Sequence, residues 1–147
     1  MADSDLMQLY SRRILALTTA IPHQGRLDAP EATASKRSPH CGSSVSVDVV
    51  LRDGAIVDFA QQVRACALGQ ASAAVLGGAV MGRTRDELVV ARDELRAMLK
   101  QDGPVPNPPF ADLEALLPAR DYPNRHASIL LAWDATIEAM DSALAAA

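Results

Sequence analysis

The most informative part of this chain is CGSSVSVDVVLRDGAIVDFAQQVRAC, residues 41–66. Over residues 44–51, valine and leucine alternate with mostly polar residues, which is the two-residue period of a strand with one buried face. The pair Asp53-Gly54 then predicts a hairpin turn, because both residues tolerate a positive φ. A second strand over residues 55–63 would return antiparallel to the first, so this stretch predicts a β-hairpin with a cysteine at each end.

Helices are predicted on the C-terminal side of the hairpin. Small residues over 67–81 indicate a helix that Gly82 could end. Thr84 followed by Glu87 matches a capping box, in which each side chain bonds the other residue's backbone N–H. This pair predicts a further helix that runs to about Leu99.

A proline-rich segment, residues 101–110, interrupts the helical part of the chain. Prolines at this density exclude regular structure. We expect a short helix over residues 111–117 that stops at Pro118. The last helix is expected over residues 127–144, where apolar residues recur at helical spacing.

On the N-terminal side of the hairpin, residues 5–19 have the apolar spacing of a helix. No apolar period follows, so residues 20–40 are predicted to form a long mobile loop. The order is a helix, two or three strands and then helices. It predicts one α+β domain over residues 1–147, with a small antiparallel sheet of about three strands and helices packed on one face.

Composition narrows the function classes. The chain has 147 residues, of which 49% are hydrophobic but only 3% aromatic, so an aliphatic core is expected. A formal net charge of −4 disfavours nucleic acid as the main partner, because phosphate backbones require basic surfaces. The uncharged residues 65–82 are too small and polar for a membrane span, and the N-terminus lacks the charge order of a secretory signal. We therefore expect a cytoplasmic protein that does not enter a membrane.

The two cysteines are the main candidates for chemistry. They are too few for a disulfide-rich scaffold or for a closed four-ligand zinc site made of cysteines. Because a hairpin returns the chain to its start, Cys41 and Cys66 are expected at the same end of the sheet. Cys66 also precedes a helix, whose dipole would favour a thiolate.

Short motifs along the chain match a known family in their order and spacing. They are Leu9-Tyr10, Pro22 with Gly25, Pro39 with Cys41-Gly42, Asp53-Gly54, Ala71-Ser72-Ala73, and Tyr122-Pro123-Asn124-Arg125 before a helix that carries Trp133. Together they resemble the IscU/SufU/NifU N-terminal type of iron–sulfur cluster assembly scaffold, over most of the chain. The resemblance is closest to the SufU-like branch, in which the 101–110 segment would be an insertion.

The resemblance implies a metal site made of three cysteines and one aspartate. Carried over, these positions are Cys41, Ser43, Cys66 and Ser128, so the aspartate and the third cysteine are serines here. The last position becomes Ala127 if the preceding histidine is matched to one found in some relatives. The resemblance also implies a carrier rather than an enzyme. Such a carrier receives sulfur from a cysteine desulfurase, holds iron or zinc, and passes an iron–sulfur cluster to acceptor proteins.

The two serines weaken the predicted metal site. A hydroxyl at neutral pH is neither deprotonated nor soft, so an iron–sulfur cluster or zinc is expected to bind weakly or not at all. Ser128 is expected to cap the last helix, and Ser43 to lie in a loop or at a strand edge. His40 and His126 could supplement the two cysteines as zinc ligands.

Three alternatives stay open for the two cysteines. They could accept persulfide sulfur from a cysteine desulfurase, which does not require four ligands. They could have no chemical role, if this protein is a relative of the scaffold that keeps its fold, binds no metal and acts through interaction or regulation. They could also form a disulfide switch, which requires a Cα separation below about 7 Å.

Overall fold

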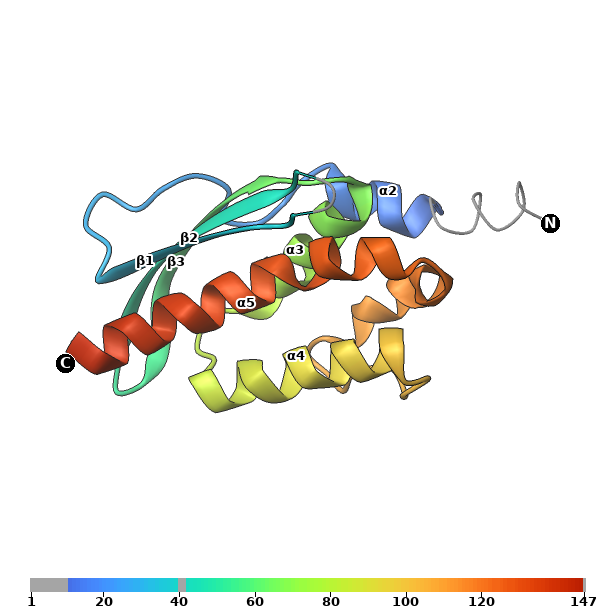
Figure 1. The fold of residues 1–147 in the computed structure, drawn as a ribbon. Coiled ribbons are helices and arrows are strands. Elements are labelled where there is room, and N and C mark those ends of the chain that lie inside the picture. The colour runs from blue at the N-terminus through green and yellow to red at the C-terminus, as the bar shows by residue number, and fades with distance from the viewer. Residues whose placement is uncertain (1–10, 40–41, 147) are drawn as a thin grey trace.

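The computed structural model describes residues 11–39 and 42–146 (Figure 1). It confirms the α+β class and the three-stranded antiparallel sheet. Residues 5–10 of the first predicted helix lie outside the described residues. The elements are, in order, α2 (Arg12–Thr18), β1 (Ala32–Arg37), β2 (Ser44–Arg52), β3 (Ala55–Arg64), α3 (Ala67–Ala79), α4 (Arg85–Lys100), the 3₁₀ helix η1 (Ala111–Asp121) and α5 (Pro123–Ala146).

The strands β2 and β3 form the predicted hairpin. Asp53 and Gly54 connect them with φ angles of 54° and 81°, the left-handed conformation that both residues tolerate. The valines of β2 that alternate with polar residues are buried on one face: Val45, Val47 and Val49. Strand β1 pairs with the other side of β2, which gives the order β1-β2-β3.

The prediction of a loop over residues 20–40 is wrong for its second half, because Ala32–Arg37 form β1. Only Ala34 of this strand is buried, and exposed polar residues alternate with it. The strand therefore has no apolar period that the sequence could reveal. It is held instead by its backbone pairing with β2 and by cross-strand contacts such as Ser35 Oγ to Ser46 Oγ at 2.7 Å.

One buried carboxylate anchors the segment before β1. Asp48 on β2 accepts hydrogen bonds from Arg26 Nε at 2.7 Å, the Leu27 N–H at 3.0 Å and Thr33 Oγ1 at 2.6 Å. Because side chains alternate along a strand, Asp48 lies on the face opposite the buried valines. The segment before β1 therefore covers part of the sheet face that the helices leave free.

Helices cover the other face of the sheet, as predicted. The long helix α5 runs across β1 and β2, α3 packs beside it, and α4 packs on α5 away from the sheet (Figure 1). The core between them is mainly aliphatic. Its largest fully buried side chains are Trp133, Phe59, Ile14, Ile56, Leu68, Leu76, Leu88, Leu95, Met98, Leu99, Leu113 and Leu116.

Two helix starts test the capping predictions. The capping box of α4 is confirmed, because Thr84 Oγ1 accepts from the Glu87 N–H while the Glu87 carboxylate accepts from the Thr84 N–H. Helix α5 begins at Pro123 and not at Ala127. Proline is tolerated in a first helical turn because the N–H it lacks has no partner there.

The predicted stop at Pro118 is also wrong. The 3₁₀ helix continues to Asp121 with Pro118 inside it, and its buried side chains, including Leu116 and Ala119, hold it against the core. Residues 101–110 form neither helix nor strand, as their prolines predict. Within the described ranges, no helix has the length and apolar character needed to cross a membrane.

Candidate functional site

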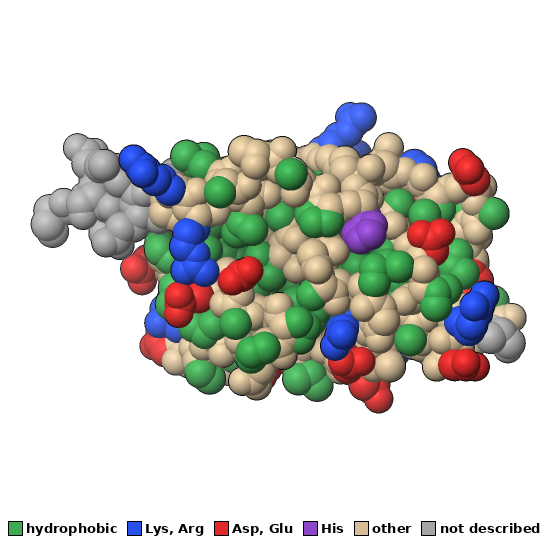
Figure 2. Space-filling model, turned by 180° about the vertical axis from the view of Figure 1, so that it is seen from behind, with side chains coloured by type: hydrophobic (Ala, Val, Ile, Leu, Met, Phe, Trp, Pro, Cys, Tyr) green, Lys and Arg blue, Asp and Glu red, His purple; other side chains and the backbone are tan. Residues whose placement is uncertain are grey.

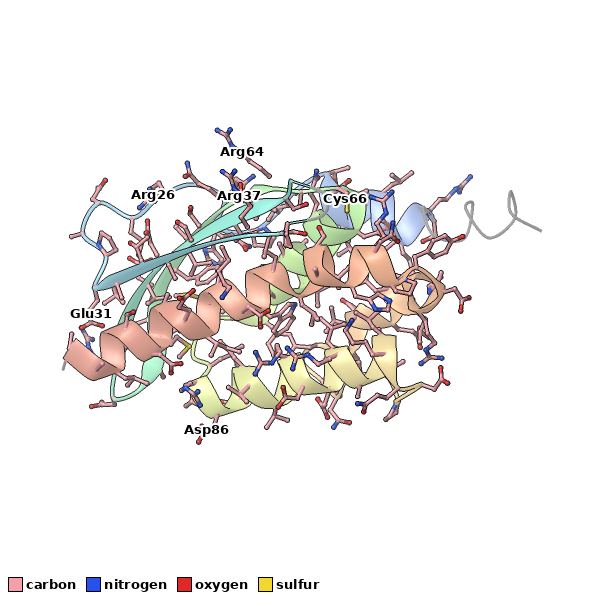
Figure 3. The ribbon with its side chains drawn as sticks, in the orientation of Figure 1. Arg26, Glu31, Arg37, Arg64, Cys66 and Asp86 are labelled. Carbon is pink, nitrogen blue, oxygen red and sulfur yellow. The ribbon has the colours of Figure 1, made fainter. Side chains whose placement is uncertain are left out.

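Three side chains from distant parts of the chain meet at one end of the sheet. Ser43 precedes β2, Cys66 is the N-cap residue of α3, and Ser128 lies in α5. Ser128 Oγ lies 3.0 Å from Ser43 Oγ and 3.6 Å from Cys66 Sγ. We call these three residues the serine–cysteine cluster. Figure 3 shows Cys66 at the end of the sheet where α3 begins.

Strand pairing explains why the first two members are neighbours. Ser44, at the start of β2, lies opposite Arg64, at the end of β3. Residues just before β2 and just after β3 therefore come together, as the hairpin pattern predicts. Helix α5 crosses the same end of the sheet and adds Ser128 from its buried side.

The hydroxyls of the cluster are internal, whereas the thiol reaches the surface. Ser43 is 3% exposed and Ser128 is 2% exposed. Cys66 is partly exposed, and its thiol is free as far as the described residues extend. Cys66 is therefore the member of the cluster that a partner molecule can reach.

Helices α3 and α5 approach closely beside the cluster. A Cβ atom at Gly69 would lie 2.6 Å from Ser128 Oγ, so the contact needs a glycine. Ser72 Oγ donates to the Ile129 carbonyl at 2.7 Å and accepts from the Trp133 indole N–H at 2.9 Å. From the sequence, Ser72 and Trp133 stand out only as residues of motifs that resemble the family. Gly69 has no sequence signal beyond its small size.

The prediction that Ser128 caps the last helix is wrong. Because α5 begins at Pro123, Ser128 lies inside the helix. Its hydroxyl bonds Ser43 across the core instead of a helical N–H. Ser43 does precede a strand, but the sequence gives no sign that its side chain is buried against α5.

His126 is engaged elsewhere through both ring nitrogens. Nε2 lies 2.8 Å from the Ala119 carbonyl oxygen, and Nδ1 lies 3.4 Å from Lys100 Nζ. Burial is the main reason that the pKa of His126 is lowered; the hydrogen bond to the Ala119 carbonyl opposes this in part, and the positive charge of Lys100 adds a lesser lowering. The neutral ring donates from Nε2 and accepts at Nδ1. To bind zinc, His126 would have to break one of these bonds.

The described side chains do not fit the ligand set that the resemblance implies. Residues 11–39 and 42–146 contain no group of three or more His, Cys, Asp or Glu side chains that could hold a metal ion. A hydroxyl–hydroxyl hydrogen bond occupies the positions expected for the aspartate and the third cysteine. Neutral hydroxyls are poor ligands for iron or zinc beside thiolate, imidazole and carboxylate.

The other predicted ligands, His40 and Cys41, lie outside the described residues. The approach of Cys41 to Cys66, the disulfide between them and the ligand set with His40 therefore stay predictions.

Known proteins resemble this chain in sequence and in fold. A family model described as the NifU-like N-terminal domain matches residues 9–129. The N-terminal part of a nitrogen-fixing NifU-like protein from Brucella abortus is 43% identical, with a TM-score of 0.94. That alignment covers 97% of this chain and 99% of the Brucella chain.

Two more distant relatives carry functional names. The iron–sulfur cluster assembly scaffold protein IscU of Streptococcus pyogenes serotype M1 is 29% identical over 141 residues, which cover 95% of this chain and 87% of that protein. A candidate scaffold protein for the SUF system from Fervidobacterium islandicum AW-1 has a TM-score of 0.81 at 20% identity. It covers 91% of this chain and 98% of its own, and it supports the fold alone.

Proposed function

Because the chain belongs to the NifU-like N-terminal domain family, we propose that it is a carrier in iron–sulfur cluster assembly whose own hold on metal is weak. Relatives named as iron–sulfur cluster assembly scaffold proteins support the role. The observation that supports weak metal binding is the Ser43–Ser128 hydrogen bond, because it places neutral hydroxyls at two positions where the family has metal ligands.

In this role the iron–sulfur cluster or its sulfur is cargo. A cysteine desulfurase would supply sulfur at the exposed Cys66 thiol, and acceptor proteins would receive what the carrier holds. The carrier itself catalyses no reaction, and we place it in the cytoplasm.

Anaerobic reconstitution with iron and sulfide tests this proposal, with visible absorption measured after desalting. The natural chain should retain little cluster. Ser43→Asp combined with Ser128→Cys should retain more, because it restores a carboxylate and a thiolate. Ser35→Asp combined with Ser46→Cys is the matched control. Those two serines are also hydrogen-bonded to each other, but their contact is exposed and joins β1 to β2. A stable cluster on the natural chain, at one per monomer, would contradict the weak hold.

A second candidate function is persulfide acceptance at Cys66, which its partial exposure favours. The Cys66 thiolate would attack the outer sulfur of a cysteine persulfide on the desulfurase. A new S–S bond forms on Cys66, the donor S–S bond breaks, and the donor cysteine leaves as a thiolate. Because electrons balance in this exchange, it needs no external oxidant or reductant.

Mass spectrometry after incubation with a cysteine desulfurase and cysteine tests the second candidate. The chain should gain the mass of one sulfur atom, and Cys66→Ser should abolish the gain while Cys41→Ser keeps it. No added sulfur on either cysteine rules out persulfide acceptance. If the double variant Cys41→Ala with Cys66→Ala also leaves cellular function unchanged, the protein instead shares only the fold of the scaffold family and acts through interactions that need neither cysteine.

A further inference from the structure

A groove of about 520 Å³ opens beside the edge of the sheet, between β1, α4 and α5. Leu130 and Leu131 of α5 form an apolar floor. The residues around it carry positive charge from two elements: Lys36 and Arg37 on β1, and Arg96 and Lys100 on α4.

This positive charge is only partly balanced. Asp134 also lines the groove, but it already pairs with an arginine of α4 at 2.7 Å. Lys36 has one half-exposed partner, Glu138, at 3.6 Å. Within the described residues, Arg37 and Arg96 are in no ion pair. The groove is thus a local cationic site on a chain whose net charge is −4.

Strand β1, which borders the groove, has an open edge. It pairs with β2 on one side, and no described strand pairs with its other side. The Ser38 N–H donates to the Ser43 carbonyl at 2.8 Å, so by alternation Ser38 and Lys36 direct their backbone groups toward β2. The backbone N–H and C=O groups of Ser35 and Arg37 therefore point outward.

The opposite edge of the sheet is covered. On β3, the Gln61 N–H donates to the His23 carbonyl at 2.9 Å, and the Gly25 N–H donates to the Gln61 carbonyl at 2.8 Å. The chain thus covers the edge of β3 with its own backbone and leaves the edge of β1 available.

Cations flank the open edge on both faces of the sheet. Successive side chains of a strand point to opposite faces, so Lys36 and Arg37 lie on different sides. Figure 3 labels Arg37 and Cys66 along the upper side of the view, where the sheet lies, and Asp86 at the lower edge, on α4. On the face seen from behind, Lys and Arg side chains are spread among Asp and Glu (Figure 2).

We propose that the open edge of β1 and the adjoining groove bind an extended acidic segment of a partner protein. The segment would add a strand to the sheet, so main-chain hydrogen bonds supply affinity. Its carboxylates would contact Arg37 on one face of the added strand. On the other face they would contact Lys36, Arg96 and Lys100. This positive charge would favour acidic sequences over neutral or basic ones. Hydrophobic contact with the groove floor would add to the main-chain bonds.

The position of the groove gives this docking a consequence for the cluster. Ser38 and Ala127 line the groove. Ser38 bonds Ser43 through the backbone, and Ala127 directly precedes Ser128. A segment bound here would hold its parent protein next to the partly exposed Cys66. The proposal does not depend on whether Cys66 carries sulfur or metal.

Fluorescence anisotropy with a labelled peptide of alternating Glu and Asp, about ten residues long, tests the charge requirement on the full chain. Arg37→Glu with Arg96→Glu should weaken binding by about tenfold or more. Arg12→Glu with Arg52→Glu makes the same change in net charge outside the groove and should change affinity by less than about twofold. Equal weakening by both variants, each verified as folded by circular dichroism, would overturn the groove as the binding site.

A second arm tests strand addition and the identity of the occupant. N-methylation of alternate peptide residues removes backbone donors, so it should weaken binding of the acidic peptide to the natural chain. A peptide of Gln and Asn, which lacks the carboxylates, should not bind. Undiminished binding of the N-methylated peptide would overturn strand addition. Displacement of the peptide by inorganic phosphate, or tighter binding of an oligonucleotide, would assign the groove to a different ligand and overturn the proposal.

Discussion

Ser43 Oγ and Ser128 Oγ lie 3.0 Å apart, although 85 residues separate them in the chain. Their hydrogen bond joins the start of β2 to α5 at the place where the family resemblance expects an aspartate and a cysteine. Both side chains are buried, so the bond is shielded from water. It links the same two elements that a shared metal ion would link.

A double-mutant cycle measures this link. Ser43→Ala and Ser128→Ala should each lower the free energy of unfolding, by about 1 kcal/mol, because each removes one partner of a buried hydrogen bond. The double variant should lose less than the sum, with a coupling energy of about 0.5–1 kcal/mol in urea denaturation. The same cycle on the exposed pair Ser35 and Ser46 is the control and should give a smaller coupling. Strict additivity at Ser43 and Ser128 would mean that the bond contributes nothing.

Gly69 and Gly78 of α3 should respond in opposite directions to alanine. A Cβ atom at Gly69 would meet Ser128 Oγ at 2.6 Å and Ala65 Cβ at 2.8 Å, so Gly69→Ala should destabilise the protein by about 1–3 kcal/mol. A Cβ at Gly78 has no neighbour within 4 Å, so Gly78→Ala should stabilise the helix by about 0.5–1 kcal/mol. Thermal unfolding of both variants checks the pair, and a stable Gly69→Ala would show that α3 and α5 can separate at this point.

Asp48 should make stability fall in acid. Burial alone would raise its pKa, but hydrogen bonds from Arg26, Thr33 and Leu27 together lower the pKa below its ordinary value. The folded state therefore holds the charged form more strongly, and this stability is present above about pH 4 and lost as pH falls further. Asp48→Asn should remove that part of the pH dependence and cost about 1–3 kcal/mol at neutral pH.

The exposed Asp58→Asn provides the control for Asp48 in unfolding curves collected from neutral to acid pH. It should lower the free energy of unfolding much less than Asp48→Asn does, because its carboxylate is exposed. An unaltered acid profile in Asp48→Asn would exclude Asp48 as the source of the acid dependence.

His126 should contribute a separate pH dependence at higher pH. Its pKa is lowered chiefly by burial, so the unfolded chain takes up a proton at this residue before the folded protein does. Stability should therefore fall as pH decreases from about 6.5 toward the lowered pKa. His126→Gln should flatten this region of the curve, and the ring proton shifts in NMR should titrate below the usual range. An ordinary histidine titration in the folded protein would contradict the buried neutral ring.

The hairpin shows which parts of this fold are predictable. Residues 44–51 carry a two-residue apolar period, and Asp53-Gly54 form a turn; both features act over short distances in the chain. The capping box of α4 is equally local, since it joins Thr84 to Glu87. The sequence does not predict β1, because this strand is stabilised by pairing with β2 rather than by an apolar pattern of its own side chains.

The candidate site, too, has features that local sequence predicts and features that depend on tertiary packing. Local sequence patterns place Cys66 between a strand and a helix, and the family resemblance points to Ser43 and Ser128. Their roles depend on where α5 begins and which way its buried side faces. Those features are decided by packing against the sheet and α3, which involves residues far apart in sequence.

Sequence alone was therefore sufficient for the hairpin, for the presence of the helices that follow it, for the family and for the replacement of two ligand positions by serine. These properties follow from residue identity and from short-range periodicity. Only the tertiary structure decided that the two serines bond each other, that His126 is engaged with Ala119 and Lys100, and that β1 leaves an open cationic edge. The reason is physical: each of these depends on contacts between elements, and a linear pattern does not specify such contacts.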